Sequence, residues 1–312
     1  MKKPQTLPRK TSASSYPNPF VKWAGGKRKL APLLIETFPE DFDPEKHRYF
    51  EPFIGGGALM FALGNPESPL NIPGKNLFIN DLNPELTNTY EVIRDNVSAL
   101  IKELELLTKR INEKTFYEIR ATVPRGKVAR AARFIYLNKT CFNGLWRVNS
   151  KGEFNVPFGK SKNPSLFVEE NLRACSKRLK GCTITNTTFE KAVAKARKGD
   201  LVYFDPPYIP LSASASFAAY AKEGFNLADQ ELLAETIQKL SAKGVFVLLS
   251  NSDTPMTRKI FRKTLTLRKV LMSRSISSSG STRTPVFEVL GMNYGHLRGS
   301  AMGELDLISR PN

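Results

Sequence analysis

Gly199 to Tyr208 reads Gly-Asp-Leu-Val-Tyr-Phe-Asp-Pro-Pro-Tyr, and this stretch predicts both a strand and a site. Leu201 to Phe204 is a short apolar run rich in residues that favour β-structure, which predicts a buried strand. Asp205 follows, and two prolines then end the strand, because proline has no N–H for a sheet and fixes φ. In an open α/β sheet, ligands bind beyond the carboxyl ends of the strands. The stretch therefore predicts a ligand site at Asp205.

The turn after this strand combines a carboxylate, backbone carbonyls and an aromatic ring. Asp205 precedes a proline, which restricts it to extended geometry, and Tyr208 offers a face for stacking. A planar base that carries an exocyclic amine needs acceptors for its N–H groups and a ring beside its plane. The motif favours such a base; the alternative is an ordinary Pro-Pro turn at a strand end.

The charge of the chain points to a polyanionic partner. Among 312 residues, Lys and Arg number 47 against 29 acidic residues, which gives a formal net charge of +18. This excess predicts nucleic acid before a membrane as the partner, with a solvated basic surface as the alternative. No apolar run reaches the roughly 18 residues that span a bilayer, so we expect no membrane association.

Cysteine and histidine are too few for a metal site or a catalytic triad. The three cysteines, Cys141, Cys175 and Cys182, are odd in number and lack metal-site spacing. The chain has two histidines. Residues 1–19 are polar and proline-rich, which predicts no secretory signal. We expect no metal, and reduced thiols in a cytoplasmic protein.

Two glycine-containing stretches precede the Asp-Pro-Pro-Tyr motif. Tyr49 to Leu63 reads Tyr-Phe-Glu-Pro-Phe-Ile-Gly-Gly-Gly-Ala-Leu-Met-Phe-Ala-Leu, the strand–turn–helix pattern of a nucleotide-type site. Phe78 to Asp81 predicts a second strand that ends in an acid. A glycine loop lets backbone approach a ligand, and the acid suits ribose hydroxyls, so together they predict a nucleoside. Gly-x-Gly-x-x-Gly is absent, which disfavours NAD.

The other stretch is Phe20 to Leu30, which reads Phe-Val-Lys-Trp-Ala-Gly-Gly-Lys-Arg-Lys-Leu. It predicts a loop that opens a helix and lets backbone N–H groups approach an anion or carboxylate. Trp23 offers a stacking face. The spacing of a Walker loop is absent.

Asn138 to Lys162 interleaves basic, amide and aromatic residues around Ser150 to Glu153, which predicts a hairpin turn. Arg and Asn read guanine and adenine edges with paired hydrogen bonds, and aromatic rings can wedge between bases or stack on them. This segment is the best candidate for reading a DNA sequence; a purely structural hairpin is the alternative. Ser273 to Thr284, rich in hydroxyl and basic side chains, suits phosphate oxygens.

The rest of the chain predicts regular elements. Residues 84–137 have helical periodicity. Further predictions are a helix over 226–240, strands over 245–249, 265–271 and 286–290, and a loop over 211–220 that closes over a ligand.

Seven stretches in order resemble the motifs of Dam-type (D12 class) DNA adenine-N6 methyltransferases. They span residues 22–27, 51–58, 80–83, 143–159, 205–208, 248–254 and 274–283. The resemblance implies an α/β fold: a Rossmann-like S-adenosylmethionine-dependent methyltransferase sheet with helices on both faces, plus an inserted, mainly helical target-recognition domain with a β-hairpin. It implies a flexible basic tail over 1–18, a discontinuous catalytic domain over 19–83 and 185–295, the recognition domain over 84–184 and a C-terminal tail over 296–312.

The resemblance also implies an activity: methyl transfer from S-adenosylmethionine to a flipped adenine in double-stranded DNA, commonly within GATC, by a monomer in the cytoplasm at the nucleoid. The implied catalytic residues are Asp205, Pro206 and Tyr208. The implied cofactor-binding residues are Trp23, Lys27, Phe53, Gly55, Gly57, Asp81 and Asp205. The implied DNA-binding residues are Lys22, Asn138, Phe142, Asn143, Leu145, Arg147, Asn149, Pro157, Lys160, Arg274, Ser278 and Arg283.

Three positions depart from the family pattern. Phe142 stands where relatives often carry Tyr, Trp146 stands where a smaller residue is common, and Ser161 stands where an aromatic residue can follow the basic residue.

Three other functions are left open. An RNA adenine methyltransferase would use the same chemistry, and a protein-amide methyltransferase would bind a planar amide but leave the basic excess without a role. A non-catalytic DNA-binding regulator on the same scaffold would not need S-adenosylmethionine.

Overall fold

The structure is a computed structural model. It describes residues 17–65, 70–159, 161, 164–207, 225–272, 286–298 and 306–307. None of the helices in this described part of the chain is both long and apolar enough to cross a membrane.

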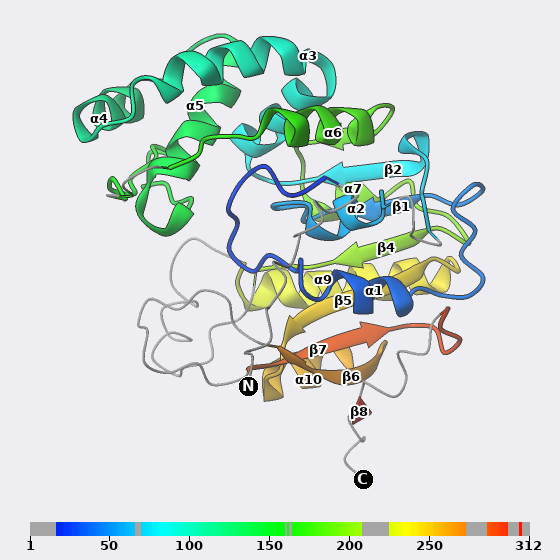
Figure 1. The fold of residues 1–312 in the computed structure, drawn as a ribbon. Coiled ribbons are helices and arrows are strands. Elements are labelled where there is room, and N and C mark those ends of the chain that lie inside the picture. Colours follow the sequence, from blue (N-terminus) through cyan, green and yellow to red (C-terminus); the bar gives the residue numbers. More distant parts are fainter. Residues whose placement is uncertain are drawn as a thin grey trace, which may run out of the picture.

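One eight-stranded sheet forms the centre of the described structure, with the order β3-β2-β1-β4-β5-β7-β6-β8 (Figure 1). The parallel strands are β1 (Tyr49–Glu51), β2 (Leu77–Asn80), β3 (Thr183–Thr185), β4 (Leu201–Phe204) and β5 (Phe246–Ser252). The antiparallel strands are β6 (Thr266–Met272), β7 (Val286–Met292) and β8 (Asp306–Leu307). The chain proceeds outward from β1 to β3 and then returns to β4, so the strand order reverses between β1 and β4. Ligands bind at such a reversal.

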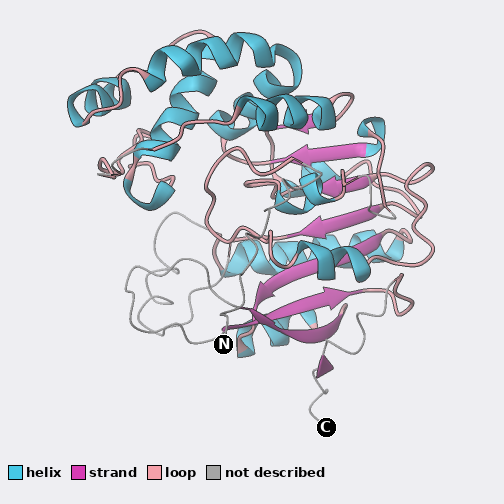
Figure 2. Ribbon diagram, viewed as in Figure 1, coloured by secondary structure: helices cyan, strands magenta, loops and turns pink. Residues whose placement is uncertain are grey.

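Helices cover both faces of the sheet (Figure 2), because successive strand residues point to opposite sides. Leu201 and Tyr203 of β4 lie in one apolar cluster, and Val202 and Phe204 lie in another. The first cluster includes residues of α1 (Ala31–Glu36) and α2 (Ala58–Ala62). The second includes α7 (Phe189–Val193), α9 (Leu227–Ala242) and α10 (Pro255–Phe261). The sequence prediction of an α/β sheet covered on both faces is confirmed.

Four helices lie between β2 and β3 in the chain and gather at one end of the molecule (Figure 1). They are α3 (Pro84–Thr108), α4 (Glu113–Ala121), α5 (Lys127–Thr140) and α6 (Glu169–Leu179). The helical periodicity over 84–137 thus becomes three helices, and α6 was not predicted. Residues of α3, α5 and α6 belong to the same apolar cluster as the sheet, so the insertion shares the core. The boundary expected between residues 184 and 185 falls inside β3.

A small hairpin follows α5 and the 3-10 turn η2 (Phe142–Gly144). Val148 and Phe154 form an antiparallel bridge, and the Asn155 N–H donates to the Arg147 carbonyl at 3.1 Å. The turn closes with the Gly152 N–H on the Asn149 carbonyl at 2.9 Å. The hairpin predicted around Ser150 to Glu153 is therefore confirmed, although its arms are single bridges rather than full strands.

Both terminal segments reach further into the fold than the sequence indicated. Asn18, assigned to the tail, exchanges backbone–side-chain hydrogen bonds with Asn171 of α6 at 2.7 and 2.9 Å. Leu297, assigned to the C-terminal tail, forms an antiparallel bridge with Pro39, and β8 pairs with the edge strand β6. Contacts made through the backbone of these segments leave no composition signal, which is why both look like tails in the sequence.

The remaining short element is η1 (Gly74–Asn76), directly before β2.

Candidate active site

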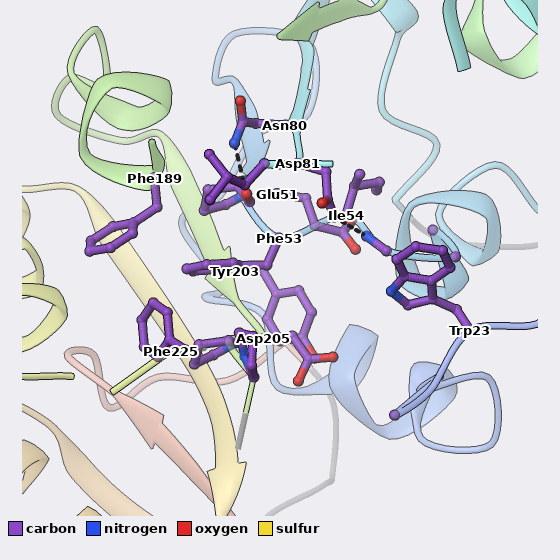
Figure 3. A pocket seen from close by; sticks show the side chains of 18 of the residues that line it. Trp23, Glu51, Phe53, Ile54, Asn80, Asp81, Phe189, Tyr203, Asp205 and Phe225 are labelled. Atoms are coloured by element: carbon purple, nitrogen blue, oxygen red, sulfur yellow. Dashed lines mark hydrogen bonds between the residues drawn. The ribbon is translucent and has the colours of Figure 1, made fainter. Parts of the chain in front are cut away.

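A cavity of about 850 Å³ lies beyond the carboxyl ends of β1, β2 and β4, where the strand order reverses (Figure 3). Its walls come from residues 23–27, 51–59, 80–82, 187–190, 203 and 205–207, together with Phe225, Asp229 and Leu232. The position is the one that the strand order predicts for a ligand, and a volume of this size suits a small organic molecule.

Three carboxylates enter this cavity from three neighbouring strands. Glu51 ends β1, Asp81 follows β2 and Asp205 follows β4. All three side chains line the cavity, as Figure 3 shows. A concentration of carboxylates in a concave site favours a cationic ligand or one that donates several hydrogen bonds.

Asp81 fixes the conformation of the glycine loop. Its Oδ2 accepts from the Gly55 N–H at 3.0 Å, and its Oδ1 accepts from the Asn83 N–H at 3.0 Å. Burial raises the pKa of Asp81, and these backbone donors act in the opposite direction. The acid at the end of β2 therefore links β2, the loop after β1 and the start of α3.

The loop itself needs glycine at specific positions. Gly57 has a φ of +72°, and a Cβ there would lie 2.6 Å from the hydroxyl of the buried Tyr90. That hydroxyl donates to the Gly55 carbonyl at 2.9 Å. A Cβ on Gly55 would meet the Trp23 ring at 2.6 Å. The chain thus presents bare backbone to the cavity, with an aromatic ring against it.

Lys27 lies beside Asp205 and is almost completely buried. Its Nζ is 3.2 Å from Asp205 Oδ1 and 3.5 Å from Glu288 Oε1. The Ser250 hydroxyl donates to the same Asp205 oxygen at 2.8 Å. Lys27, expected at the cofactor, lines the cavity, and its ammonium lies between Asp205, which follows β4, and Glu288 of β7.

The segment expected to read DNA forms an exposed surface that begins at the cavity. Lys22 adjoins Trp23 of the cavity wall, and its backbone N–H donates to the Asn138 side chain at 2.8 Å. Phe142 and Leu145 are 49% and 42% exposed. Arg147 is exposed, and its Nε donates to the Asn155 side chain at 2.8 Å. Asn143, Asn149 and Pro157 also lie on this segment with partly or fully exposed side chains.

Asn138 is a correction to the list of DNA-contacting residues. Its side chain is fully buried, and its amide nitrogen donates to the carbonyls of Lys22 and Gly144 at 2.8 and 3.0 Å. An amide used by two loops is not available to a base edge. Asn138 therefore holds Lys22 against the segment instead of touching DNA.

Comparison with known proteins assigns the chain to a family. The sequence model of the D12 class N6 adenine-specific DNA methyltransferases matches residues 23–274. The chain belongs to this family. It is an adenine-specific DNA methyltransferase.

Three relatives match along most of their length. The chain is 42% identical over 289 residues to the Type II methyltransferase M1.LlaDCHI of Lactococcus lactis subsp. cremoris, covering 89% of the chain and 96% of the relative. It is 38% identical over 291 residues to the Type II methyltransferase M.MjaIII of Methanocaldococcus jannaschii, covering 88% and 99%. It is 34% identical over 287 residues to a DNA adenine methylase of Vibrio cholerae, covering 90% and 98%.

Several residues expected in this methyltransferase site lie outside the described residues. They are Tyr208, Lys160, Arg274, Ser278 and Arg283, together with the loop over 211–220. Within the described part of the chain, no group of three His, Cys, Asp or Glu side chains is arranged to hold a metal ion.

Two aromatic residues that line the cavity, Phe189 and Phe225, were not among those expected there. Phe53, which was expected there, packs against Phe189 and Phe225, with ring centroids 5.5 and 5.4 Å away (Figure 3). Phe189 begins α7 and Phe225 precedes α9. Both lie outside the sequence motifs that predicted the site. Together the three rings make the apolar wall of the cavity.

Glu51 was also missed as a site residue, although its motif was recognised. The signal was available: like Asp81 and Asp205, it stands at the carboxyl end of a predicted strand. Its carboxylate accepts from the buried Tyr49 hydroxyl at 2.9 Å. Burial raises the pKa of Glu51 to about 8; the Tyr49 hydrogen bond lowers it, and the charge of Asp205 raises it further.

The raised pKa of Glu51 predicts a pH-dependent stability. Because the folded protein holds this proton more tightly than the unfolded chain does, the free energy of unfolding falls as pH rises from about 4.5 to about 8. The loss is on the order of 1 kcal/mol for each pH unit of that window. Glu51→Gln, which mimics the protonated form, is expected to lack this pH dependence, so that its stability relative to the wild type rises between pH 4 and pH 8. Urea unfolding at both pH values measures this; equal pH dependence in the two proteins would refute it.

Proposed function

We propose that this methyltransferase transfers the methyl group of S-adenosylmethionine to N6 of an adenine rotated out of double-stranded DNA, within the sequence GATC. The observation that carries the proposal is the single cavity in which Asp205 at the end of β4 meets the glycine loop after β1 and Asp81 after β2. One cavity of about 850 Å³ has room for a nucleoside cofactor and a base side by side.

The residues of the cavity fit S-adenosylmethionine. Its sulfonium and ammonium groups are cations, and the acidic side chains of Glu51, Asp81 and Asp205 line the cavity, where a bound cation would lower the raised pKa of Glu51. The bare backbone of the glycine loop allows close approach of the nucleoside, and Asp81 lies where it would receive ribose hydroxyls. Trp23 and Phe53 supply aromatic faces for the adenine ring or the cationic sulfur. When bound, this cofactor supplies an electrophilic methyl group.

At the other end of the cavity, the Asp-Pro-Pro turn would hold the target amine. A base must leave the stack because its N6 is otherwise engaged in pairing. Asp205 would accept one N6 hydrogen, the Pro206 carbonyl would accept the other, and Tyr208 would stack on the ring. These acceptors direct the nitrogen lone pair out of the plane of the base and toward the methyl group. As the new N–C bond forms, the S–C bond would break to leave a neutral thioether, and N6 would lose one proton to Asp205 or to water. The rate gain would come from orientation and electrostatics, without a covalent enzyme intermediate.

Residues 84–184 would act as the target-recognition domain, with the exposed segment from Phe142 to Pro157 against DNA. Lys22 and Arg147 supply charge, and Phe142 and Leu145 supply apolar side chains that can occupy the space of the displaced base. The net charge of +18 supports a duplex substrate. GATC rests on the family resemblance and on relatives named DNA adenine methylase. Such an enzyme would work as a monomer in the cytoplasm, at the nucleoid.

Methylome sequencing of DNA from a methylation-free host that expresses this chain tests the proposal directly, because it reports the base, its position and its sequence together. N6-methyladenine at GATC is the expected result. Methylated adenine in another sequence would overturn the GATC assignment, and the absence of modified adenine would overturn the activity on DNA.

Arg147→Ala is expected to relax discrimination at one base pair of the target by about 1–3 kcal/mol, because an arginine that reads a guanine edge makes two hydrogen bonds. The measurement is kcat/KM on duplexes that differ from the target by one base pair. Lys151→Ala, at the exposed tip of the same hairpin, is the control and should leave the ratios unchanged. Identical discrimination in Arg147→Ala and the wild type would rule out this role.

A further inference from the structure

Behind Asp205, two hydroxyl groups form a buried chain of hydrogen bonds. The Tyr203 hydroxyl is 2.9 Å from the Ser250 hydroxyl, and Ser250 Oγ donates to Asp205 Oδ1 at 2.8 Å. Tyr203 is 1% exposed and Ser250 is fully buried. Tyr203 belongs to β4 and Ser250 to the neighbouring parallel strand β5, so the contacts join the two strands at the site.

The direction of these hydrogen bonds follows from the donors available. An ionised carboxylate only accepts, and a serine hydroxyl has one proton. Ser250 donates that proton to Asp205, so Tyr203 must donate to Ser250. Burial, followed by the negative charge of Asp205, raises the pKa of Tyr203 well above its ordinary range, which keeps its proton in place. The hydrogen bonds are therefore donated in one direction, from Tyr203 to Ser250 and from Ser250 to Asp205.

The rest of the catalytic turn is held from the same strand. Asn251, the next residue of β5, donates to the Gln230 side chain at 3.3 Å, and Gln230 donates to the Pro207 carbonyl at 3.4 Å. Gln230 and Asn251 are fully buried. Two successive β5 residues thus secure both ends of the stretch from Asp205 to Pro207.

We propose that Ser250, supported by Tyr203, is a positioning residue for methyl transfer. It fixes the rotation of the Asp205 carboxylate by engaging Oδ1 together with Lys27, and so presents Asp205 to the target amine in one orientation. This inference rests on the proposed role of Asp205. Positioning matters here because a misplacement of about 1 Å at a reacting centre can cost roughly 10²-fold in rate.

The test is Ser250→Ala, assayed for single-turnover transfer of a tritiated methyl group from S-adenosylmethionine to duplex DNA from a methylation-free host. Single turnover isolates the transfer step from product release. We expect this rate to fall by about 10- to 100-fold, while KM for the cofactor and the DNA changes by less than about twofold. Ser250→Thr keeps the hydroxyl and should recover most of the rate, and Tyr203→Phe should give a smaller loss.

Ser241→Ala is the matched control. The Ser241 hydroxyl also donates one hydrogen bond, to the Ile237 carbonyl at 2.8 Å, and accepts one, from Asn293 at 2.9 Å, but it does not line the cavity. Ser241→Ala should keep the wild-type rate of methyl transfer and lose about as much stability as Ser250→Ala does.

Each other outcome decides the question. A wild-type rate in Ser250→Ala would overturn the inference, and so would a loss that Thr fails to restore or that appears equally in KM. If Ser250→Ala does not fold, a wild-type rate in Tyr203→Phe or a dead Ser250→Thr overturns it instead. Activity in Asp205→Ala would remove the proposed role of Asp205 itself, so the two failures are distinguishable.

Discussion

Asp205→Ala is expected to abolish methyl transfer while DNA binding stays close to that of the wild type. The substitution removes the acceptor for the N6 hydrogen, and it leaves the buried Lys27 ammonium at the place where the target amine must bind. Loss of one preorganised electrostatic group costs roughly 10²–10³ in kcat, and the Lys27 charge, no longer balanced by Asp205, increases the loss. Asp205→Asn keeps one acceptor oxygen of similar size and should retain a small part of the activity.

Methyl incorporation into duplex DNA and fluorescence anisotropy with the same duplex separate transfer from binding. Asp253→Ala is the matched control, because Asp253 follows the end of β5 as Asp205 follows β4. Its carboxylate pairs with Arg258, Oδ1 to Nε at 2.6 Å, and it does not line the cavity. Near-wild-type turnover in Asp205→Ala would contradict the proposed mechanism, and equal loss in both variants would indicate a general effect on the fold.

The parts of the site that lie within one local pattern could be predicted from the sequence. A four-residue apolar run followed by Asp-Pro-Pro predicts the end of a buried strand, and β4 has the bounds that were expected. The triple glycine requires a tight turn, and Asp81 at the next strand end comes near it because parallel strands end at the same edge. Local chemistry and the topology of parallel sheets were sufficient for these features.

The contacts that organise the Asp205 carboxylate could not be predicted. Ser250 and Glu288 meet Asp205 and Lys27 only through the pairing of β4 with β5 and of β5 with β7. The sequence predicted this strand only as far as Leu249, because polar residues are rare in buried strands, and so left Ser250 outside it. The burial of the Asn138 amide could not be predicted for a similar reason, since composition does not show whether an amide faces a base or a backbone carbonyl.

Elements without an apolar signal were missed as well. The edge strand β3, Thr-Ile-Thr, has an exposed and partly exposed burial pattern, and α6 carries charges along most of its length. Each is specified by its neighbours: β3 pairs with β2, and α6 packs against α3. Tertiary context, rather than propensity, decides such segments.

Gly57→Ala is expected to destabilise the protein by about 2–5 kcal/mol and to remove measurable binding of S-adenosylmethionine. The left-handed backbone at Gly57 costs a residue with a Cβ about 1–2 kcal/mol. The new Cβ would lie 2.6 Å from the Tyr90 hydroxyl and 3.1 Å from the Phe61 ring, both fully buried. Forcing a buried ring to move adds about 1–3 kcal/mol. Tyr90 would then release the Gly55 carbonyl, and the loop would lose the shape that faces the cavity.

Gly152→Ala separates the two costs. Gly152 has a φ of +76°, close to that of Gly57, but a Cβ there meets nothing within 4 Å. It should lose only the backbone cost of about 1–2 kcal/mol and bind the cofactor as the wild type does. Urea unfolding and calorimetric titration with S-adenosylmethionine measure both quantities. Equal destabilisation of the two variants would show that the contact with Tyr90 carries no weight, and normal cofactor binding by Gly57→Ala would show that the glycine loop is not the cofactor's cradle.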